Sequence, residues 1–110
     1  MVKALSIYKL TQTMSITEFD RYCRGWSELK IIFSDDNQKR DFSSPAFMCM
    51  VFDEVIISRN PNAVHLRNSN GTLSVSGIEK IELYEGGVGD IVVLHSRLNG
   101  QLSKFKLIFD

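Results

Sequence analysis

The residues that could do catalytic chemistry in this chain are few and scattered. His65 and His95 are the two histidines, and neither lies in a motif that places an acid, a nucleophile and an orienting group beside it. Cys23 falls on the apolar stripe of an expected helix, where a thiol is usually part of the core rather than a nucleophile. We therefore expect a protein that is not an enzyme.

Two segments have the composition of a ligand site without its spacing. Residues 35–41 collect aspartates, but the glycine and the final glutamate of a calcium loop are absent, and Lys39 and Arg40 interrupt the carboxylates. Gly86 to Gly89 is rich in glycine, yet a strand follows it rather than a helix whose N-terminus could hold phosphate. We expect a solvated loop and a wide hairpin, with no metal and no cofactor.

The composition is that of one ordinary globular domain. The chain has 110 residues, of which 44% are hydrophobic and 24% charged, so we expect a single domain over 1–110. Thirteen basic and thirteen acidic residues cancel to a net charge of zero. This balance excludes the broad positive field that a non-specific nucleic-acid binder or a membrane-surface protein usually carries.

The cysteines and the apolar runs indicate a cellular compartment. Cys23 and Cys49 are too few and too far apart for a disulfide framework or a metal knuckle. The first ten residues contain two lysines and alternate polar with apolar types, unlike a signal peptide, and no run approaches the roughly 20 apolar residues that span a bilayer. We expect a cytoplasmic protein that does not enter a membrane.

The first half of the chain predicts one helix and several strands. Ser15 and Glu18 form a capping-box pattern, which starts a helix that ends near Gly25. Its apolar stripe comprises Ile16, Phe19, Tyr22, Cys23 and Trp26. Residues 28–34 alternate as a strand, and 46–52 is an apolar run typical of a strand covered on both faces. Residues 2–10 fit either a strand or part of a longer helix.

In the second half, the turns set the strand registers, which can then be checked against the apolar pattern. A two-residue type I′ turn at Asn99-Gly100 pairs Leu94 with Phe105 and Val92 with Leu107. The same reading of Asn70-Gly71 pairs Leu66 with Val75 and His65 with Ser76. A four-residue loop through Asn60-Pro61-Asn62 pairs Ile57 with Val64 and Val55 with Leu66, and the glycine-rich loop pairs Leu83 with Val92 and Ile81 with Leu94. All four registers place apolar pairs on one common face.

The alternation slips by one residue near Gly77, which predicts a bulge or bend there. Strands kinked in this way twist strongly. The expected fold is an α+β domain, a strongly twisted antiparallel β-meander of about six to eight strands that forms a half-barrel or roll, with one N-terminal helix packed on it.

The polar face of this meander carries a local basic bias. Its cations on neighbouring strands are Arg67, Lys80, Arg97, Lys104 and Lys106, together with both histidines. Glu54 and Glu82 share the face, and alternating lysines on a last strand are a common protection against aggregation. Nucleic-acid binding is therefore the alternative interpretation of this chain.

One end of the same face is apolar where a solvated sheet should be polar, and we call it the predicted patch. Its members are Ile56, Tyr84, Ile91, Val93 and Ile108. The sequence favours an interpretation in which Phe19, Tyr22 and Trp26 of the helix, or residues 46–52, cover the predicted patch. In the other interpretation, the patch binds a protein partner or forms a homodimer.

These features together predict a small non-enzymatic protein-binding module. An inhibitor or accessory protein of a phage or mobile element is one subclass of such short chains without motifs, although no residue argues for it specifically. The sequence carries no motif that identifies the partner.

Overall fold

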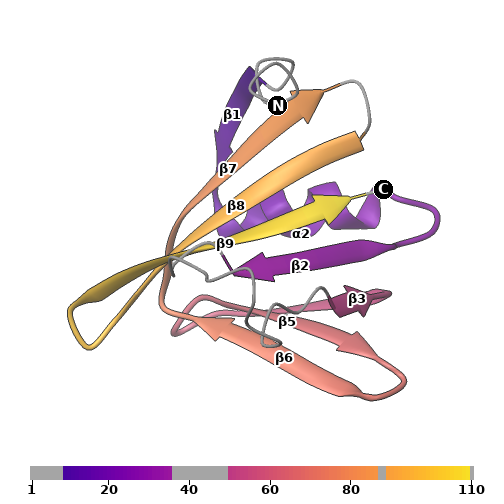
Figure 1. The fold of residues 1–110 in the computed structure, drawn as a ribbon. Coiled ribbons are helices and arrows are strands. Elements are labelled where there is room, and N and C mark those ends of the chain that lie inside the picture. Colours follow the sequence, from indigo (N-terminus) through magenta and orange to yellow (C-terminus); the bar gives the residue numbers. More distant parts are fainter. Residues whose placement is uncertain (1–8, 36–49, 87–88, 110) are drawn as a thin grey trace, which may run out of the picture.

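The computed structural model describes residues 9–35, 50–86 and 89–109, which form one helix and nine strands in two antiparallel sheets (Figure 1). In chain order the elements are β1 (Lys9–Met14), α2 (Ile16–Arg24), β2 (Ile31–Asp35), β3 (Met50–Phe52), β4 (Glu54–Ser58), β5 (Ala63–Asn68), β6 (Gly71–Ser76), β7 (Ile78–Gly86), β8 (Gly89–Leu98) and β9 (Gln101–Phe109). The predicted α+β class, a twisted antiparallel sheet with a packed helix, is confirmed. No described helix is long and apolar enough to cross a membrane.

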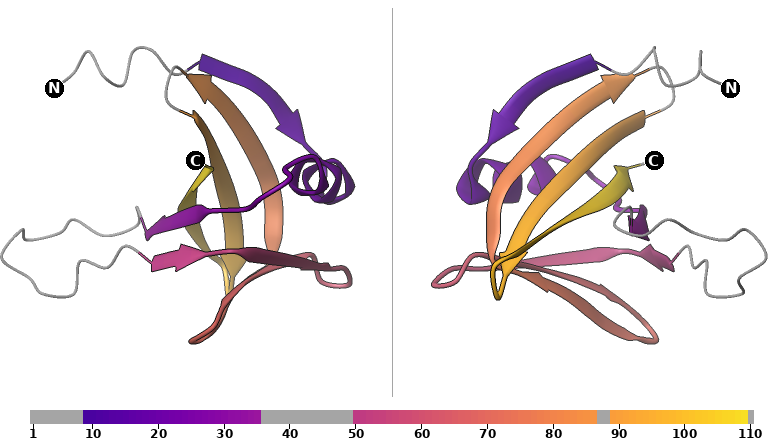
Figure 2. Two further views of the ribbon diagram at one scale, coloured as in Figure 1. Left: turned by 90° about the vertical axis from the view of Figure 1, so that its right-hand side faces the viewer. Right: turned by 60° about the vertical axis from the view of Figure 1, so that its left-hand side comes forward.

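The two sheets meet at an angle and enclose the core between them (Figure 2). The six-stranded sheet has the order β1-β7-β8-β9-β2-β3, and the three-stranded sheet has the order β4-β5-β6. The meander expected after Asp53 is thus divided into two hairpin sets, with Gly77 between them. This arrangement is an open roll rather than a closed barrel.

The helix begins and ends where the capping residues predict. The Ser15 hydroxyl accepts a hydrogen bond from the Glu18 amide at 3.1 Å, and the Glu18 carboxylate accepts one from the Ser15 amide at 2.8 Å. Both groups satisfy amides that the first helical turn leaves without a carbonyl partner. At the other end, Gly25 caps the helix through bonds to the carbonyls of its last turn.

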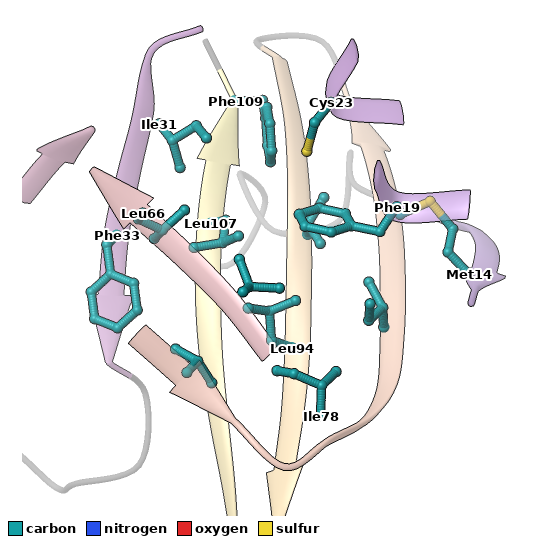
Figure 3. Close-up of a cluster of buried hydrophobic side chains, with 14 of the residues drawn as sticks. Met14, Phe19, Cys23, Ile31, Phe33, Leu66, Ile78, Leu94, Leu107 and Phe109 are labelled. Atoms are coloured by element: carbon teal, nitrogen blue, oxygen red, sulfur yellow. The ribbon is translucent and has the colours of Figure 1, made fainter. Parts of the chain in front are cut away.

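The buried face of the helix packs on the inner face of the six-stranded sheet (Figure 3). Phe19 is fully buried, and its ring meets Phe109 edge-on at 6.3 Å between centroids. Tyr22 contacts the same ring at 5.2 Å, and its hydroxyl donates to Asp90 Oδ2 at 2.5 Å. The helix also contacts β1 and β4, so it fills the gap between the first strands of the two sheets.

The registers set by three of the four turns are confirmed. Asn99 and Gly100 have φ values of 52° and 77°, as a type I′ turn requires at both positions, and Leu94 pairs with Phe105. The remaining confirmed pairs are Val92 with Leu107, Val55 with Leu66, Ile57 with Val64, Leu83 with Val92 and Ile81 with Leu94.

The register predicted between β5 and β6 is wrong by two residues. Leu66 pairs with Leu73 rather than Val75, and His65 pairs with Ser74 rather than Ser76. The cause is Asn68, whose side-chain Oδ1 accepts hydrogen bonds from the amides of Asn70 and Gly71 at 2.8 and 3.1 Å. This Asx-type turn moves the two turn residues one place earlier. A shift of two residues keeps each side chain on its predicted face.

The strands of the first half differ from expectation in extent. Residues 1–8 and 36–49 lie outside the described residues, and with them most of the segments predicted over 2–10, 35–41 and 46–52. A strand rather than a helix contains Lys9 and Leu10, and it continues to Met14. Met50–Phe52 is an edge strand whose Val51 is 46% exposed, so this part of the run is not covered on both faces.

The corner between the sheets depends on Gly77, as the slip in alternation predicts. Its φ is +68°, and its carbonyl accepts a hydrogen bond from the Arg97 amide at 2.9 Å. A Cβ added at this position would lie 2.4 Å from the Arg97 carbonyl oxygen. A bulge at Glu79 follows at once, because Ile78 pairs with Ser96 and Lys80 with His95. Only glycine allows β6 to pass this close to β8.

We predict that Gly77→Ala destabilises the fold more than Gly100→Ala. Both glycines have positive φ, which costs an alanine about 1–2 kcal/mol. Only Gly77 adds a backbone clash, and overpacking of this kind costs roughly 1–3 kcal/mol more. Urea unfolding of both variants measures the difference. Equal losses of unfolding free energy would show that the sheets do not touch at this corner.

Candidate functional site

An apolar row crosses the whole outer face of the six-stranded sheet. Its members, one from each strand in spatial order, are Leu10, Tyr84, Ile91, Ile108, Ile32 and Val51. Each is directly opposite the next in the strand pairing. Leu10 and Val51 at its two ends are 52% and 46% exposed, and the four members between them are half-buried. We call these six side chains the apolar row.

The apolar row lies on the face turned away from the core. Its chain neighbours Leu83, Val92 and Leu107 are buried on the inner face, and side chains of a strand alternate between faces. The helix and the three-stranded sheet both pack on that inner face. The expectation that Phe19, Tyr22 and Trp26 cover the predicted patch is therefore wrong, because all three pack beside Phe109 in the interior.

The structure keeps four members of the predicted patch together and separates the fifth. Tyr84, Ile91 and Ile108 belong to the apolar row, and Val93 lies one step along β8 on the same face. Ile56 instead pairs with His65 on the three-stranded sheet, where it is 39% exposed. The corner at Gly77 separates β4 from this face, and reasoning from hairpins alone extended the face across that corner.

Sequence reasoning missed three members of the apolar row. Leu10, Ile32 and Val51 reach it through the pairings of β1 with β7, β9 with β2 and β2 with β3. The first two of these pairings join strands that are distant in the chain, so no hairpin turn in the sequence indicates their register. The available signal was the alternation around Ile32, whose neighbours Ile31 and Phe33 are both buried.

Charged side chains occupy the same face beside the apolar row. The adjoining positions hold Glu82, Val93 and Lys106 in one line across β7, β8 and β9, and Lys80, His95 and Lys104 in the next. Lys80, Lys104 and Lys106 of the predicted nucleic-acid residues thus share one face. The outer face is apolar at one end of its strands and rich in cations at the other.

Glu82 is the centre of the charged region. Its carboxylate lies 2.6 Å from His95 Nε2 and 3.3 Å from Lys80 Nζ, and the Glu82 and His95 side chains are each only 12% exposed. Burial alone would raise the pKa of this carboxyl, but the hydrogen bonds from His95 and Lys80 outweigh it and lower the pKa. Glu82 therefore stays ionised and partly offsets the charge of its cationic neighbours.

Tyr84 links the charged region to the apolar row. Its hydroxyl lies 3.5 Å from Glu82 Oε1, while its ring occupies the second position of the row. Burial, followed by the nearby Glu82 charge, raises the pKa of the phenol. A tyrosine placed in this way offers an apolar ring and a neutral hydroxyl to a partner, a combination enriched in protein interfaces.

The other two predicted cations lie elsewhere and are paired with carboxylates. Arg67 is on the three-stranded sheet, 3.7 Å from Glu54 Oε1. Arg97 is beyond the bulge near the β8–β9 turn, 3.2 Å from Glu79 Oε2. The five cations expected to form one basic face are thus divided between two sheets.

His65 is part of a polar cluster that ties three strands together. Its Nε2 lies 3.0 Å from the Ser58 hydroxyl on β4, and its Nδ1 lies 2.7 Å from the Ser74 hydroxyl on β6. Both ring nitrogens therefore have a partner across the three-stranded sheet. The cluster lies on the sheet surface with Ile56 beside it. None of these contacts comes from a carboxylate that could orient the imidazole for catalysis. We therefore interpret His65 as a structural link between the three strands.

The remaining chemical candidates carry no site among the described residues. Burial, followed by the nearby Asp20, raises the pKa of the Cys23 thiol to about 12, so it stays protonated and unreactive. No described cluster of three or more histidine, cysteine, aspartate or glutamate side chains could hold a metal ion. Gly86 and Gly89 pair across the β7–β8 hairpin, and the two residues between them lie outside the described residues.

Comparisons of the chain with protein families, with characterised proteins and with solved structures found no match in any of the three.

We predict that Glu82 contributes a pH-dependent part of the stability. A carboxyl whose pKa is lowered by folding stabilises the fold fully above its ordinary value of 4.5, and this contribution is lost as the pH falls through the lower folded value. The difference in unfolding free energy between the wild type and Glu82→Gln should therefore shrink below pH 4.5.

Urea unfolding across the acid range measures this difference. His95→Ala removes the closest hydrogen-bond partner, so the wild-type dependence on pH should be reduced in that variant. Parallel stability curves for the wild type and Glu82→Gln down to the acid transition would contradict the assignment of this carboxylate.

Proposed function

We propose that this protein is a non-enzymatic protein-binding module that uses the apolar row. The observation that carries the proposal is the continuity of the row, since six adjacent strands each contribute one apolar side chain to the face opposite the core. Contiguous apolar surface of this kind is a usual sign of an interaction site in a globular protein. On a sheet face that only contacts water, polar residues would occupy these positions.

The shape of the sheet supports a partner with a groove. The six-stranded sheet curls around the core, so its outer face is convex along the row (Figure 2). Two copies of a convex face touch over a small area, whereas stable interfaces bury about 1,200–2,000 Å² in total. A concave apolar surface on a different protein can follow the row along its whole length. This argument favours a protein partner over a homodimer.

The charged region indicates how a partner would be oriented on this face. Glu82, Val93 and Lys106 lie next to the row, and Lys80, His95 and Lys104 lie one step farther from it on the same face. A partner groove lined with apolar side chains and bordered by carboxylates on one side matches this order. Such electrostatic complementarity acts mainly on the rate of association and on specificity.

The test compares one substitution in the row with a matched substitution outside it. Ile91→Glu places a charge at the centre of the row, and Ile56→Glu makes the same change on the outer face of the other sheet. We expect Ile91→Glu to weaken binding of a partner by at least about 100-fold, as expected for a central interface residue, and Ile56→Glu to leave it within about twofold.

The partner is first identified by capture on the immobilised wild type, and its affinity for the purified variants is then measured by calorimetry. Sedimentation of the wild type alone examines self-association. A partner that binds both variants equally, or a dimer that Ile91→Glu dissociates, would contradict the proposed groove-bearing partner.

The alternative function, binding of nucleic acid, is tested separately. Of the five candidate cations, Arg67, Lys80 and Arg97 are each within 4 Å of a carboxylate oxygen, and this pairing reduces the charge offered to phosphates. We expect no binding of a mixed-sequence oligonucleotide at physiological salt. Affinity that falls steeply with salt and is lost on combining Lys104→Ala with Lys106→Ala would support nucleic-acid binding instead.

A further inference from the structure

A second surface, unrelated to the apolar row, lies along the free edge of β6. Within the described residues, β6 pairs only with β5 and ends the three-stranded sheet. It contains no charged residue, no proline and no bulge in its pairing. Charged residues, prolines and bulges are features by which proteins usually protect a sheet edge from pairing with another strand, and β6 has none of them.

The other sheet edges carry such protection. β1 has a lysine at its start and a bulge between Leu10 and Gln12. β3 is three residues long, and its Val51 carbonyl accepts a hydrogen bond from the Asn68 amide group at 2.8 Å. β4 begins with Glu54 and lies beside the helix, where Arg59 Nη2 donates to Thr17 Oγ1 at 3.1 Å.

The register shows which backbone groups of β6 face outward. Asn68 and Gly71 flank a two-residue turn, so they form a hydrogen-bonded pair. Along the two strands from there, hydrogen-bonded pairs alternate with pairs that are not hydrogen-bonded. Gly71, Leu73 and Val75 thus bond to β5, while the amides and carbonyls of Thr72, Ser74 and Ser76 point away from it. The Ser76 carbonyl agrees with this assignment, because it accepts the Ser96 hydroxyl at 2.5 Å on that side.

The contact at Ser76 also limits the length of the free edge. β8 approaches β6 through Ser96 and then Gly77, which closes the edge at that end. Thr72 and Ser74 remain, and both are exposed. An added strand can therefore form its backbone bonds with these two residues only.

Two hollows lie at the ends of this short edge. The first has a volume of about 520 Å³, and its lining pairs Gly71, Thr72 and Leu73 with Met50 and Phe52 of β3. The second has a volume of about 320 Å³ and lies between Ser74 to Ser76 and the β8–β9 hairpin. No charged side chain is among the described residues that line either hollow.

We propose that the edge of β6 binds a short, uncharged, extended peptide segment of another protein by strand addition. The backbone of Thr72 and Ser74 supplies the hydrogen bonds, as in other sites that add a strand to a sheet. Side chains two residues apart on the peptide are about 7 Å apart and can enter the two hollows. The first hollow suits an apolar side chain, because Met50, Phe52 and Leu73 line it.

The second hollow suits a small hydrogen-bonding side chain. Its lining includes the polar residues Ser76, Ser96, Ser103, Asn99 and Gln101. A second copy of this chain fits the site less well. Its own β6 would bring Leu73 and Val75 to the pairing, and these side chains already pack in its core. A separate segment with free side chains is the occupant that matches both hollows.

The experiment uses the full chain and a phage-displayed library of random decapeptides as the probe. Selected peptides should be uncharged and β-prone at their centre. Ser74→Pro removes one outward backbone amide and leaves the bonds to β5 intact, since proline is tolerated at such an edge position. We expect at least about tenfold weaker peptide binding, because one partner of a hydrogen bond is lost.

Ser74→Ala is the matched control. It removes the same hydroxyl contact to His65 as the proline variant but keeps the backbone amide, so binding should stay within about twofold of the wild type. Thr72→Pro is a second variant for the case that Ser74→Pro does not fold. Amide exchange at Thr72 and Ser74 should slow when a selected peptide is added to the wild type.

Three results would overturn the proposal. They are the absence of any selected peptide, selected peptides that bind the two proline variants as tightly as the wild type, and a dimer of the wild type that the proline variants dissociate. The last result would assign the edge to self-pairing. Ile91→Glu should leave peptide binding unchanged, which separates this surface from the apolar row.

Discussion

The close approach of β6 and β8 at Gly77 is the constraint on which the rest of the structure depends. A hydrogen bond from the Arg97 amide to the Gly77 carbonyl and one from Ser96 to the Ser76 carbonyl hold the two sheets together at this point. The chain turns there from one sheet into the other, and the bulge at Glu79 restores the alternation of faces. The angle set at this corner encloses the core and decides which faces remain outside.

Both proposed binding surfaces follow from that corner. Because the three-stranded sheet and the helix occupy the concave side, the outer face of the six-stranded sheet receives no cover from either of them. The apolar row on that face therefore has no explanation in the packing of the described core. The same corner closes β6 at Ser76 and leaves its edge open at Thr72 and Ser74. One surface is a sheet face and the other a sheet edge, so they can be occupied independently.

Sequence alone predicted what local chemistry determines. Asn99-Gly100 fixed its hairpin register because few other residues accept positive φ at both turn positions, and Ser15 with Glu18 fixed the start of the helix. The same reasoning failed at Asn70-Gly71, where the side chain of Asn68 competes for the turn amides. Half of the apolar row was missed because the pairings of β1 with β7 and of β9 with β2 depend on contacts between distant segments, which no turn encodes.

The asymmetry among the sheet edges has a consequence for assembly in concentrated solution. Growth of a fibril by strand pairing needs two open edges on every molecule, so that each new subunit offers a site to the next. Within the described residues this fold has only one unprotected edge. Pairing through it consumes the one open edge of the described strands, so that part of the chain offers no second edge for a further addition. The described strands can thus expose an adhesive edge without forming a template for polymerisation.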